Sequence, residues 1–264
     1  MRKKVLFYFL CFLSSIFGTV VVVVDSIAST YVEDIWVYGN LSFVLGTLLS
    51  FIMALIFMIP IKGRPLGKFA DPNFNGIFIP NREHLRFFLP MALGNAIATI
   101  GYFYIIAKML DPSAVLPFMQ LVILYLALGE IIIERDMPSL LEIQSLTMIM
   151  FGALLASISP TGTLDIHSFL IVMAVINTGS TLKIITQRRM RIMRIDGKRI
   201  DSINIRIWNL LFSTIFFLMI IGIMDPKSVM DMFHASNKLI IICLLYTSDA
   251  ADDGESVDLG GRRI

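Results

Sequence analysis

Residues 91–103 read MALGNAIATIGYF, and two stripes run along the helix that this stretch predicts. The first stripe is made of small residues at positions i, i+4 and i+7, namely Gly94, Ala98 and Gly101. The adjoining stripe is polar and consists of Asn95, Thr99 and Tyr102. Small residues let membrane helices approach closely, and lipid cannot satisfy the hydrogen bonds of a polar stripe. We therefore expect a membrane helix whose polar stripe faces the protein interior, where it either lines a cavity or bonds a neighbouring helix.

The rest of the chain has the composition of a membrane protein. Of its 264 residues, 56% are hydrophobic and 16% are charged, and the mean hydropathy is +0.79. A soluble globular domain carries about 25% charged residues. Two cysteines are too few for a disulfide framework or a zinc cluster, and a net charge of +2 does not by itself indicate a nucleic-acid partner. We therefore expect an all-α, polytopic helix bundle in a lipid bilayer.

The apolar runs predict seven membrane-crossing helices and the beginning of an eighth. Each of the seven is close to the roughly 20 residues that a helix needs to cross a bilayer. They cover residues 5–24, 36–61, 87–107, 114–133, 140–158, 166–185 and 207–224, and the eighth begins near Leu239. The first run follows MRKK and imitates a secretory signal, but it exceeds the roughly 7–15 apolar residues of such a signal. We expect it to be an uncleaved helix.

Lysine and arginine gather in alternate loops. They occur at the N-terminus, in residues 62–86 and in residues 186–206, whereas the intervening loops contain few of them. The positive-inside rule places the basic segments, and hence the N-terminus, in the cytoplasm of a multi-pass protein of the cell membrane. We interpret RRMRIMR, residues 188–194, as an anchor of this topology in preference to a site for specific anionic lipids.

The predicted span 114–133 contains unusual residues for a membrane helix. Pro117 lies inside it, and Gln120 follows about one turn later. A proline frees a backbone carbonyl that neighbours or cavity water must satisfy, and a polar side chain at mid-membrane points to function. Together with the polar stripe above and with Asn177, these residues predict a transport cavity. Its expected lining is Asn95, Thr99, Tyr102, Gln120 and Asn177.

Residues 110–157, LDPSAVLPFMQLVILYLALGEIIIERDMPSLLEIQSLTMIMFGALLAS, resemble the most characteristic stretch of the drug/metabolite transporter superfamily, EamA type. In that family one helix opens with a small-residue turn and ends in Leu-Gly-Glu-Arg, and the next closes on Gly-Ala-Leu-Leu. The positions that carry the resemblance are Pro117, Gly129, Glu130, Glu134, Arg135 and Gly152, with Gly18 in the family's opening Trp-Gly slot. Two registers fit: Gly129-Glu130 with Pro117 as the family's mid-helix proline, or Glu134-Arg135 with Leu121 in that slot.

The resemblance implies an inverted-repeat transporter fold of ten helices in two five-helix repeats. Residues 1–160 would then form the first repeat, and residues 161–242 would form an incomplete second repeat. The implied activity is secondary transport of a small organic metabolite across the membrane, with no cofactor. Neither the solute nor a coupling ion is implied.

Residues 243–264 resemble a different kind of sequence. CLLYTSDAADD matches the translation of one end of a transposase-type sequencing adapter, and VDLGGRRI matches the translation of its opposite end in the same frame. We therefore expect these residues to be adapter-derived and the natural reading frame to continue after Ile242. We also expect residues 1–242 alone to be inactive in transport, because an inverted-repeat carrier needs both repeats around its site.

No motif of a known membrane enzyme class is evident in the sequence. It contains no HExxH, no rhomboid-like GxSG, no Walker loop and no paired-Asp motif of phospholipid synthases. The three histidines, His84, His167 and His234, lie in loops or at helix ends without a partner at metal-ligand spacing. We therefore expect no enzyme activity and no metal. The alternative to a transporter is an integral membrane protein without transport activity, either a scaffold or an enzyme of unrecognised type.

Overall fold

The computed structural model describes residues 34–61, 63–108, 116–134, 139–156, 166–195 and 198–234, together with scattered residues between Phe12 and Ile27. Within these residues the fold is all-α, as predicted. Two small hairpins, each made of two strands of two residues, are the other regular elements of this described part. The chain divides into two compact units, of which the first comprises Met1–Phe78, Asp201–Leu210 and Ile220–Ile264, and the second Ile79–Ile200 and Leu211–Met219. Most of the predicted helix 5–24, the start of the eighth helix and the tail 243–264 lie outside the described residues.

The first unit is built on helix α2. Its other elements are β1 (Pro60–Ile61), β2 (Arg64–Pro65), η1 (Leu66–Phe69), parts of α8 (Ser202–Met224), α9 (Pro226–Asp231) and η5 (Met232–His234). Helix α2 covers Ile35–Phe57 and is capped by Asp34, which accepts a 2.9 Å hydrogen bond from the Trp36 backbone N–H. The predicted continuation to Ile61 is wrong, because Pro60 has no N–H to extend the helix. The chain instead turns back through Gly63, at φ 76°, into the β1–β2 hairpin.

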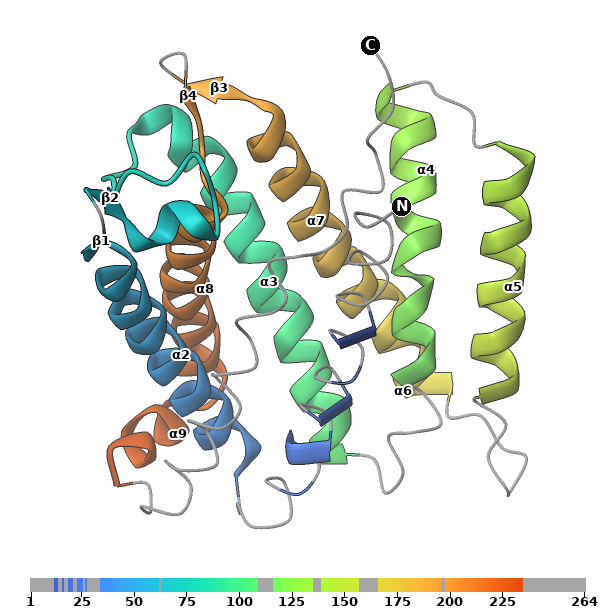
Figure 1. Ribbon diagram of the computed structural model, residues 1–264. Helices are drawn as coiled ribbons and strands as arrows, with labels where there is room; N and C mark the ends of the chain where they lie inside the picture. The colour runs from blue at the N-terminus through green and yellow to red at the C-terminus, as the bar shows by residue number, and fades with distance from the viewer. Residues whose placement is uncertain are drawn as a thin grey trace. The chain divides into compact units, whose positions relative to one another are not determined.

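The second unit is a row of helices. Figure 1 shows α3, α7, α4 and α5 side by side in that order. Its elements are α3 (Arg82–Lys108), η3 (Leu116–Leu121), α4 (Val122–Glu134), α5 (Leu140–Ala156), α6 (Ile166–Ile171), η4 (Val172–Ile176), α7 (Asn177–Ile192), β3 (Arg194–Ile195) and β4 (Lys198–Arg199). Residues 211–219 of α8 also belong to it. Helix α7 runs two turns beyond the predicted end at residue 185, so much of the basic run is helical, and its arginines complement the helix C-terminus.

Four described helices are long and apolar enough to span a membrane. They are Ile35–Phe57, Arg82–Lys108, Ile166–Ile192 and Ser202–Met224, and they overlap four of the predicted spans. The predicted spans 114–133 and 140–158 correspond to shorter apolar helices. Helix α5, with its 17 residues, is about 26 Å long, against a hydrocarbon thickness of about 30 Å. The count of seven spans stays a prediction.

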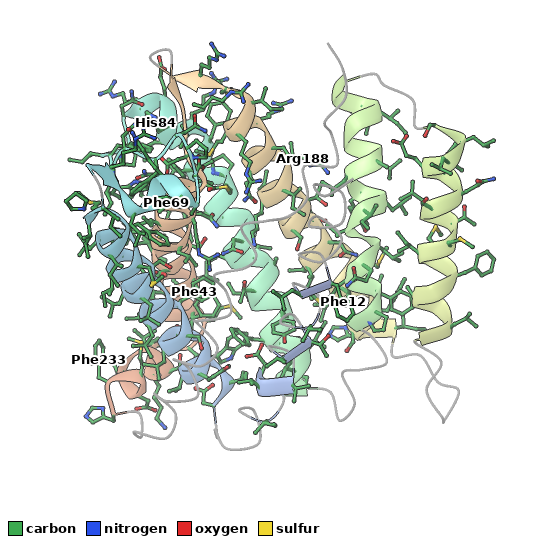
Figure 2. The ribbon with its side chains drawn as sticks, in the orientation of Figure 1. Phe12, Phe43, Phe69, His84, Arg188 and Phe233 are labelled. Atoms are coloured by element: carbon green, nitrogen blue, oxygen red, sulfur yellow. The ribbon has the colours of Figure 1, made fainter. Side chains whose placement is uncertain are left out.

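Large apolar side chains are exposed along these helices in regular stripes. On α2 the stripe has the spacing of one helical face, and Leu48, Ile52 and Leu55 are each more than half exposed. On α8 the corresponding stripe consists of Ile215, Met219 and Ile223. Figure 2 shows a further exposed aromatic residue, Phe233, projecting from the end of the described chain. Contiguous apolar surface of this kind is unfavourable in water and suits contact with lipid.

Candidate functional site

Helices α3 and α7 cross at two glycines. A Cβ atom on Gly94 would lie 2.6 Å from the Gly179 carbonyl oxygen, and a Cβ atom on Gly179 would lie 2.8 Å from the Ala98 nitrogen. One turn further along, a Cβ atom on Gly101 would lie 2.8 Å from Cγ1 of Ile176. The prediction that the small stripe of α3 permits a close helix approach is therefore confirmed. The crossing holds the segment that contains Asn177 firmly against α3.

Two irregular helical turns pack against each other beside this crossing. Residues 172–176 form a π-helical turn between α6 and α7, and residues 116–121 form a 3₁₀ turn, η3, before α4. Pro117 lies in the first turn of η3, where its missing N–H costs little. Such turns shift the register of the backbone hydrogen bonds and leave carbonyl groups without their usual helical donors, and π turns inside helices are frequent at functional sites.

Side chains satisfy carbonyl groups at both irregular turns. The Asn177 side-chain amide donates to the Phe118 carbonyl oxygen at 3.1 Å and lies 3.5 Å from the Met173 sulfur. The Tyr125 hydroxyl donates to the Met173 carbonyl oxygen at 2.9 Å. The bond from Asn177, at the start of α7, ends on η3, and the bond from Tyr125, on α4, ends on η4. The two turns are thus held together by polar groups inside an apolar bundle.

The side-chain oxygen of Asn177, unlike its amide nitrogen, lacks a hydrogen-bond partner among the described residues. The residue is fully buried, and its Oδ1 oxygen has no hydrogen-bond partner among the described residues. Exchanging the amide oxygen and nitrogen would place Oδ1 against the Phe118 carbonyl, so the hydrogen bond fixes the orientation. An unsatisfied buried acceptor costs on the order of 1–3 kcal/mol. The site therefore holds a buried hydrogen-bond acceptor that has no donor among the described residues.

The surroundings of Asn177 are apolar and aromatic. The Phe118 and Phe169 rings meet edge to face with centroids 4.8 Å apart. The buried cluster around them consists of Ala98, Ile105, Phe118, Leu121, Ala153, Val172 and Ile176. Tyr102, Met119, Phe169, Ile171 and Met173 pack against it. None of these cluster residues carries a carboxylate or an imidazole, so the cluster offers hydrogen bonding and apolar contact rather than acid–base chemistry.

Asn95 and Thr99 make a separate set of contacts on α3. The Asn95 amide donates to the Ser213 hydroxyl at 3.0 Å, and Ser213 donates to the Ala92 carbonyl oxygen at 3.3 Å. The Thr99 hydroxyl donates to the Asn95 backbone carbonyl at 2.9 Å. Asn95 therefore joins α3 to α8, which is the second of the two roles expected from the sequence. Ser213 was not predicted, although it is one of few polar residues in its span.

The structure brings some of the predicted cavity residues together and leaves others apart. Tyr102 packs against the cluster that contains Phe118, the partner of Asn177. Gln120 is exposed on η3, so it does not join the buried contacts. A shared cavity stays a prediction.

The positions that carry the family resemblance are only partly visible. Pro117 is half-buried in η3, and a Cβ atom on Gly129 would lie 3.0 Å from Cδ1 of Ile185 on α7. A Cβ atom on Gly152 would meet no atom within 4 Å. Gly18, Arg135 and the side chains of Glu130 and Glu134 lie outside the described part of the structure. The choice between the two motif registers therefore stays open.

Segments from the two predicted basic loops meet in the first unit. The Asp71 carboxylate accepts hydrogen bonds from the Ser202 backbone N–H at 2.7 Å and from the Ser202 hydroxyl at 2.9 Å. The Asn204 amide donates to the Gly76 carbonyl oxygen at 2.8 Å, and the Trp208 indole N–H donates to the Phe78 carbonyl at 2.9 Å. We call this set of bonds the loop junction. It places the two segments next to each other within the first unit.

Two carboxylates of the loop junction have pKa values shifted in opposite directions. Burial raises the pKa of Asp71, but hydrogen bonds from Ser202 and Asn73 outweigh burial and leave that pKa below its usual value. Burial also raises the pKa of Asp201, and there the hydrogen bonds from Asn204 do not compensate, so the pKa stays above its usual value. Asp201 caps α8 by accepting from the Asn204 N–H at 2.8 Å. Both residues lie outside the apolar spans, so a pattern of polar groups within those spans does not identify them.

The described residues contain no group of three or more His, Cys, Asp or Glu side chains that could hold a metal ion. The site is therefore characterised by its two irregular turns, its amide and its aromatic lining. Comparison with known proteins finds no match for this chain among family models, curated proteins or solved structures.

Proposed function

We propose that the protein is a secondary transporter that moves a small organic metabolite across the membrane, and that it belongs to the EamA-type drug/metabolite transporters. In this proposal seven helices of the chain cross the bilayer, and the N-terminus and the loop junction lie in the cytoplasm. The asymmetry of lysine and arginine supports this orientation. The contact between segments of the two basic loops at Asp71 and Ser202 agrees with it.

The observation that carries the proposal is the Asn177 acceptor at two packed irregular turns, which has no donor among the described residues. Transporters bind their solutes near the bilayer midplane at discontinuous helices, where unwound backbone and polar side chains are available. Here Asn177 joins the π turn to the 3₁₀ turn through Phe118. Its Oδ1 oxygen can accept a hydrogen bond from an N–H or O–H group of a solute.

The lining of the site favours a solute that has an apolar body and a hydrogen-bond donor. Phe118 and Phe169 offer aromatic surface, and Tyr102 packs against the same cluster. A solute whose donor met Asn177 Oδ1 would recover the cost of the unsatisfied acceptor. A conformational change that opened the junction of the two turns would expose this acceptor to one side of the membrane.

Uptake into proteoliposomes tests the proposal. The protein translated from the genomic reading frame that contains residues 1–242 is reconstituted and supplied with a mixture of amino acids, polyamines, sugars and nucleosides, and mass spectrometry identifies what accumulates. We expect Asn177→Ala to lower the uptake rate at least tenfold, because one hydrogen bond to a buried group lost from the transport path is worth on the order of 1.4 kcal/mol.

Asn40→Ala is a matched control for this variant. Asn40 is also fully buried, donates one hydrogen bond, to the Ser228 hydroxyl at 3.3 Å, and has an Oδ1 atom without a partner in the described structure. It lies in the first unit, outside the paired turns. Equal losses of uptake per folded molecule in both variants would refute the role of Asn177. An absence of uptake for every solute in the unsubstituted protein would favour the alternative of a membrane protein without transport activity.

A further inference from the structure

A cleft of about 280 Å³ lies at one end of α3 and α7. It is lined by Phe87, Arg189, Ile192 and Met193, all of which belong to the second unit. Phe87 is in the second turn of α3, and Ile192 is the last residue of α7. Both helices are among those that can span a membrane. When both helices cross the bilayer as in the proposed function, the cleft lies at the level where hydrocarbon gives way to lipid headgroups.

The lining of the cleft combines three apolar side chains with one cation. Arg189 is exposed, so its guanidinium is available at the mouth of the cleft. Further arginines lie on the same two helix ends, at positions 82, 86, 188 and 191. Against them the described residues of these helix ends carry one acidic side chain, Glu83. The local charge is strongly positive and selects for an anionic ligand.

We propose that this cleft binds an anionic phospholipid of the surrounding bilayer, with its phosphate on Arg189 and its glycerol and upper acyl chain against Phe87, Ile192 and Met193. A guanidinium presents a planar pair of N–H donors that matches the oxygens of a phosphate. Basic pockets between membrane helices at the headgroup level suit anionic lipids. The apolar walls distinguish this ligand from inorganic phosphate, which has no hydrocarbon to place there.

This proposal differs from a simple topology anchor in a measurable way. An anchor depends on the total basic charge, so exposed arginines of the segment contribute about equally. A lipid site depends on Arg189 in particular, because its guanidinium lines the cleft. Arg199 on β4 is an exposed basic residue of the same loop that does not line the cleft. Arg199→Gln is therefore the matched control for Arg189→Gln.

Lipid binding to the purified chain in neutral detergent micelles tests the site. Native mass spectrometry measures the binding of dioleoyl phosphatidylglycerol and dioleoyl phosphatidylcholine. We expect the anionic lipid to bind more tightly, and Arg189→Gln to reduce that preference about fivefold, the effect of one basic residue near the headgroup. Arg199→Gln should change it less than twofold. Unchanged thermal unfolding of both variants in lipid-free micelles verifies that the comparison concerns binding.

A second variant tests the apolar wall. Ile192→Asn should weaken the binding of both lipids, because both carry acyl chains, while leaving the preference for the anionic headgroup in place. Equal effects of Arg189→Gln and Arg199→Gln would overturn the proposal in favour of diffuse attraction. Displacement of phosphatidylglycerol by millimolar inorganic phosphate would also overturn it, since the cleft would then recognise the phosphate alone.

Discussion

Replacing Gly179 with alanine tests the helix crossing that positions Asn177. The new Cβ atom would lie 2.6 Å from the Gly94 carbonyl oxygen, 2.8 Å from the Ala98 nitrogen and 3.2 Å from the Ala98 Cα. All three are backbone atoms of α3, so no change of side-chain rotamer relieves the contact. The two helices must move apart by several tenths of an ångström, and the packing on both sides of the crossing loosens with them.

The expected loss of stability follows from two opposing terms. Overpacking a close contact costs about 1–3 kcal/mol, and the upper part of that range applies because backbone meets backbone. Alanine is the better helix former by about 1 kcal/mol. The net destabilisation of Gly179→Ala is then about 2 kcal/mol. Gly152→Ala on α5 is the control, because its Cβ atom would meet nothing within 4 Å, and it should be neutral or stabilising by up to about 1 kcal/mol.

The free energies of unfolding are measured by titrating sodium dodecyl sulfate into neutral micelles and following the fluorescence of the two tryptophans, Trp36 and Trp208. The helix-propensity term is the same in both variants. The difference of about 3 kcal/mol between their free energies of unfolding therefore measures the overpacking at the helix crossing. Gly94→Ala repeats the test from α3, since its Cβ atom would lie 2.6 Å from the Gly179 carbonyl oxygen. Unfolding of Gly179→Ala at the same detergent fraction as Gly152→Ala would refute the close crossing.

Three further predictions concern the loop junction and the topology. Because the folded pKa of Asp71 is lowered, the ionised Asp71 carboxylate stabilises the fold above the usual pKa of 3.8, and this stabilisation is lost as the pH falls through the folded value. Asp71→Asn should remove the corresponding loss of stability in acid, which unfolding titrations between pH 3 and 7 measure. The raised pKa of Asp201 has the opposite sign, so the stabilisation linked to its protonated form is complete below 3.8 and is lost as the pH rises through the folded value. A stabilising effect of acid that is as large in Asp201→Asn as in the unsubstituted protein would contradict this assignment. With Cys11 and Cys243 replaced by serine, a cysteine at Asp165 should react with an impermeant maleimide in intact cells, whereas a cysteine at Asn73 or Arg194 should react only after permeabilisation. The reverse pattern would invert the proposed orientation.

Local periodicity predicted much of the helical framework. Small residues at i, i+4 and i+7 identified the packing face of α3, because that spacing depends only on the helix itself. The overlap of four predicted spans with membrane-length helices has the same origin. The contact between Asp71 and Ser202 is compatible with the prediction that both basic loops lie on one side of the membrane, but no sequence pattern identified the particular residues that meet.

The irregular turns were not predictable in the same way. Residues 172–176, VMAVI, look like any apolar helix, and the bond that accompanies their π turn comes from Tyr125, 48 residues away. The direction of Gln120 could not be derived from a regular helix either. A 3₁₀ turn has 3.0 residues per turn instead of 3.6, so η3 directs Gln120 to the same side as Pro117 rather than about 60° away from it. A helical wheel drawn for a regular α-helix therefore misplaces the residues after this proline.

The two hydrogen atoms of the Asn177 amide have an evident structural use, whereas its oxygen does not. The amide nitrogen satisfies the Phe118 carbonyl, which the 3₁₀ turn would otherwise leave in an apolar environment. A leucine at this position would leave that carbonyl orphaned, so a donor is required for stability. A serine hydroxyl provides a donor with less polar surface to desolvate. What asparagine adds is a buried carbonyl oxygen that has no donor among the described residues and that the amide hydrogen bond to Phe118 holds in place. A preorganised acceptor of this kind lowers the entropy lost when a solute binds. The part of Asn177 that the fold does not use is therefore the part that the proposed transport function requires.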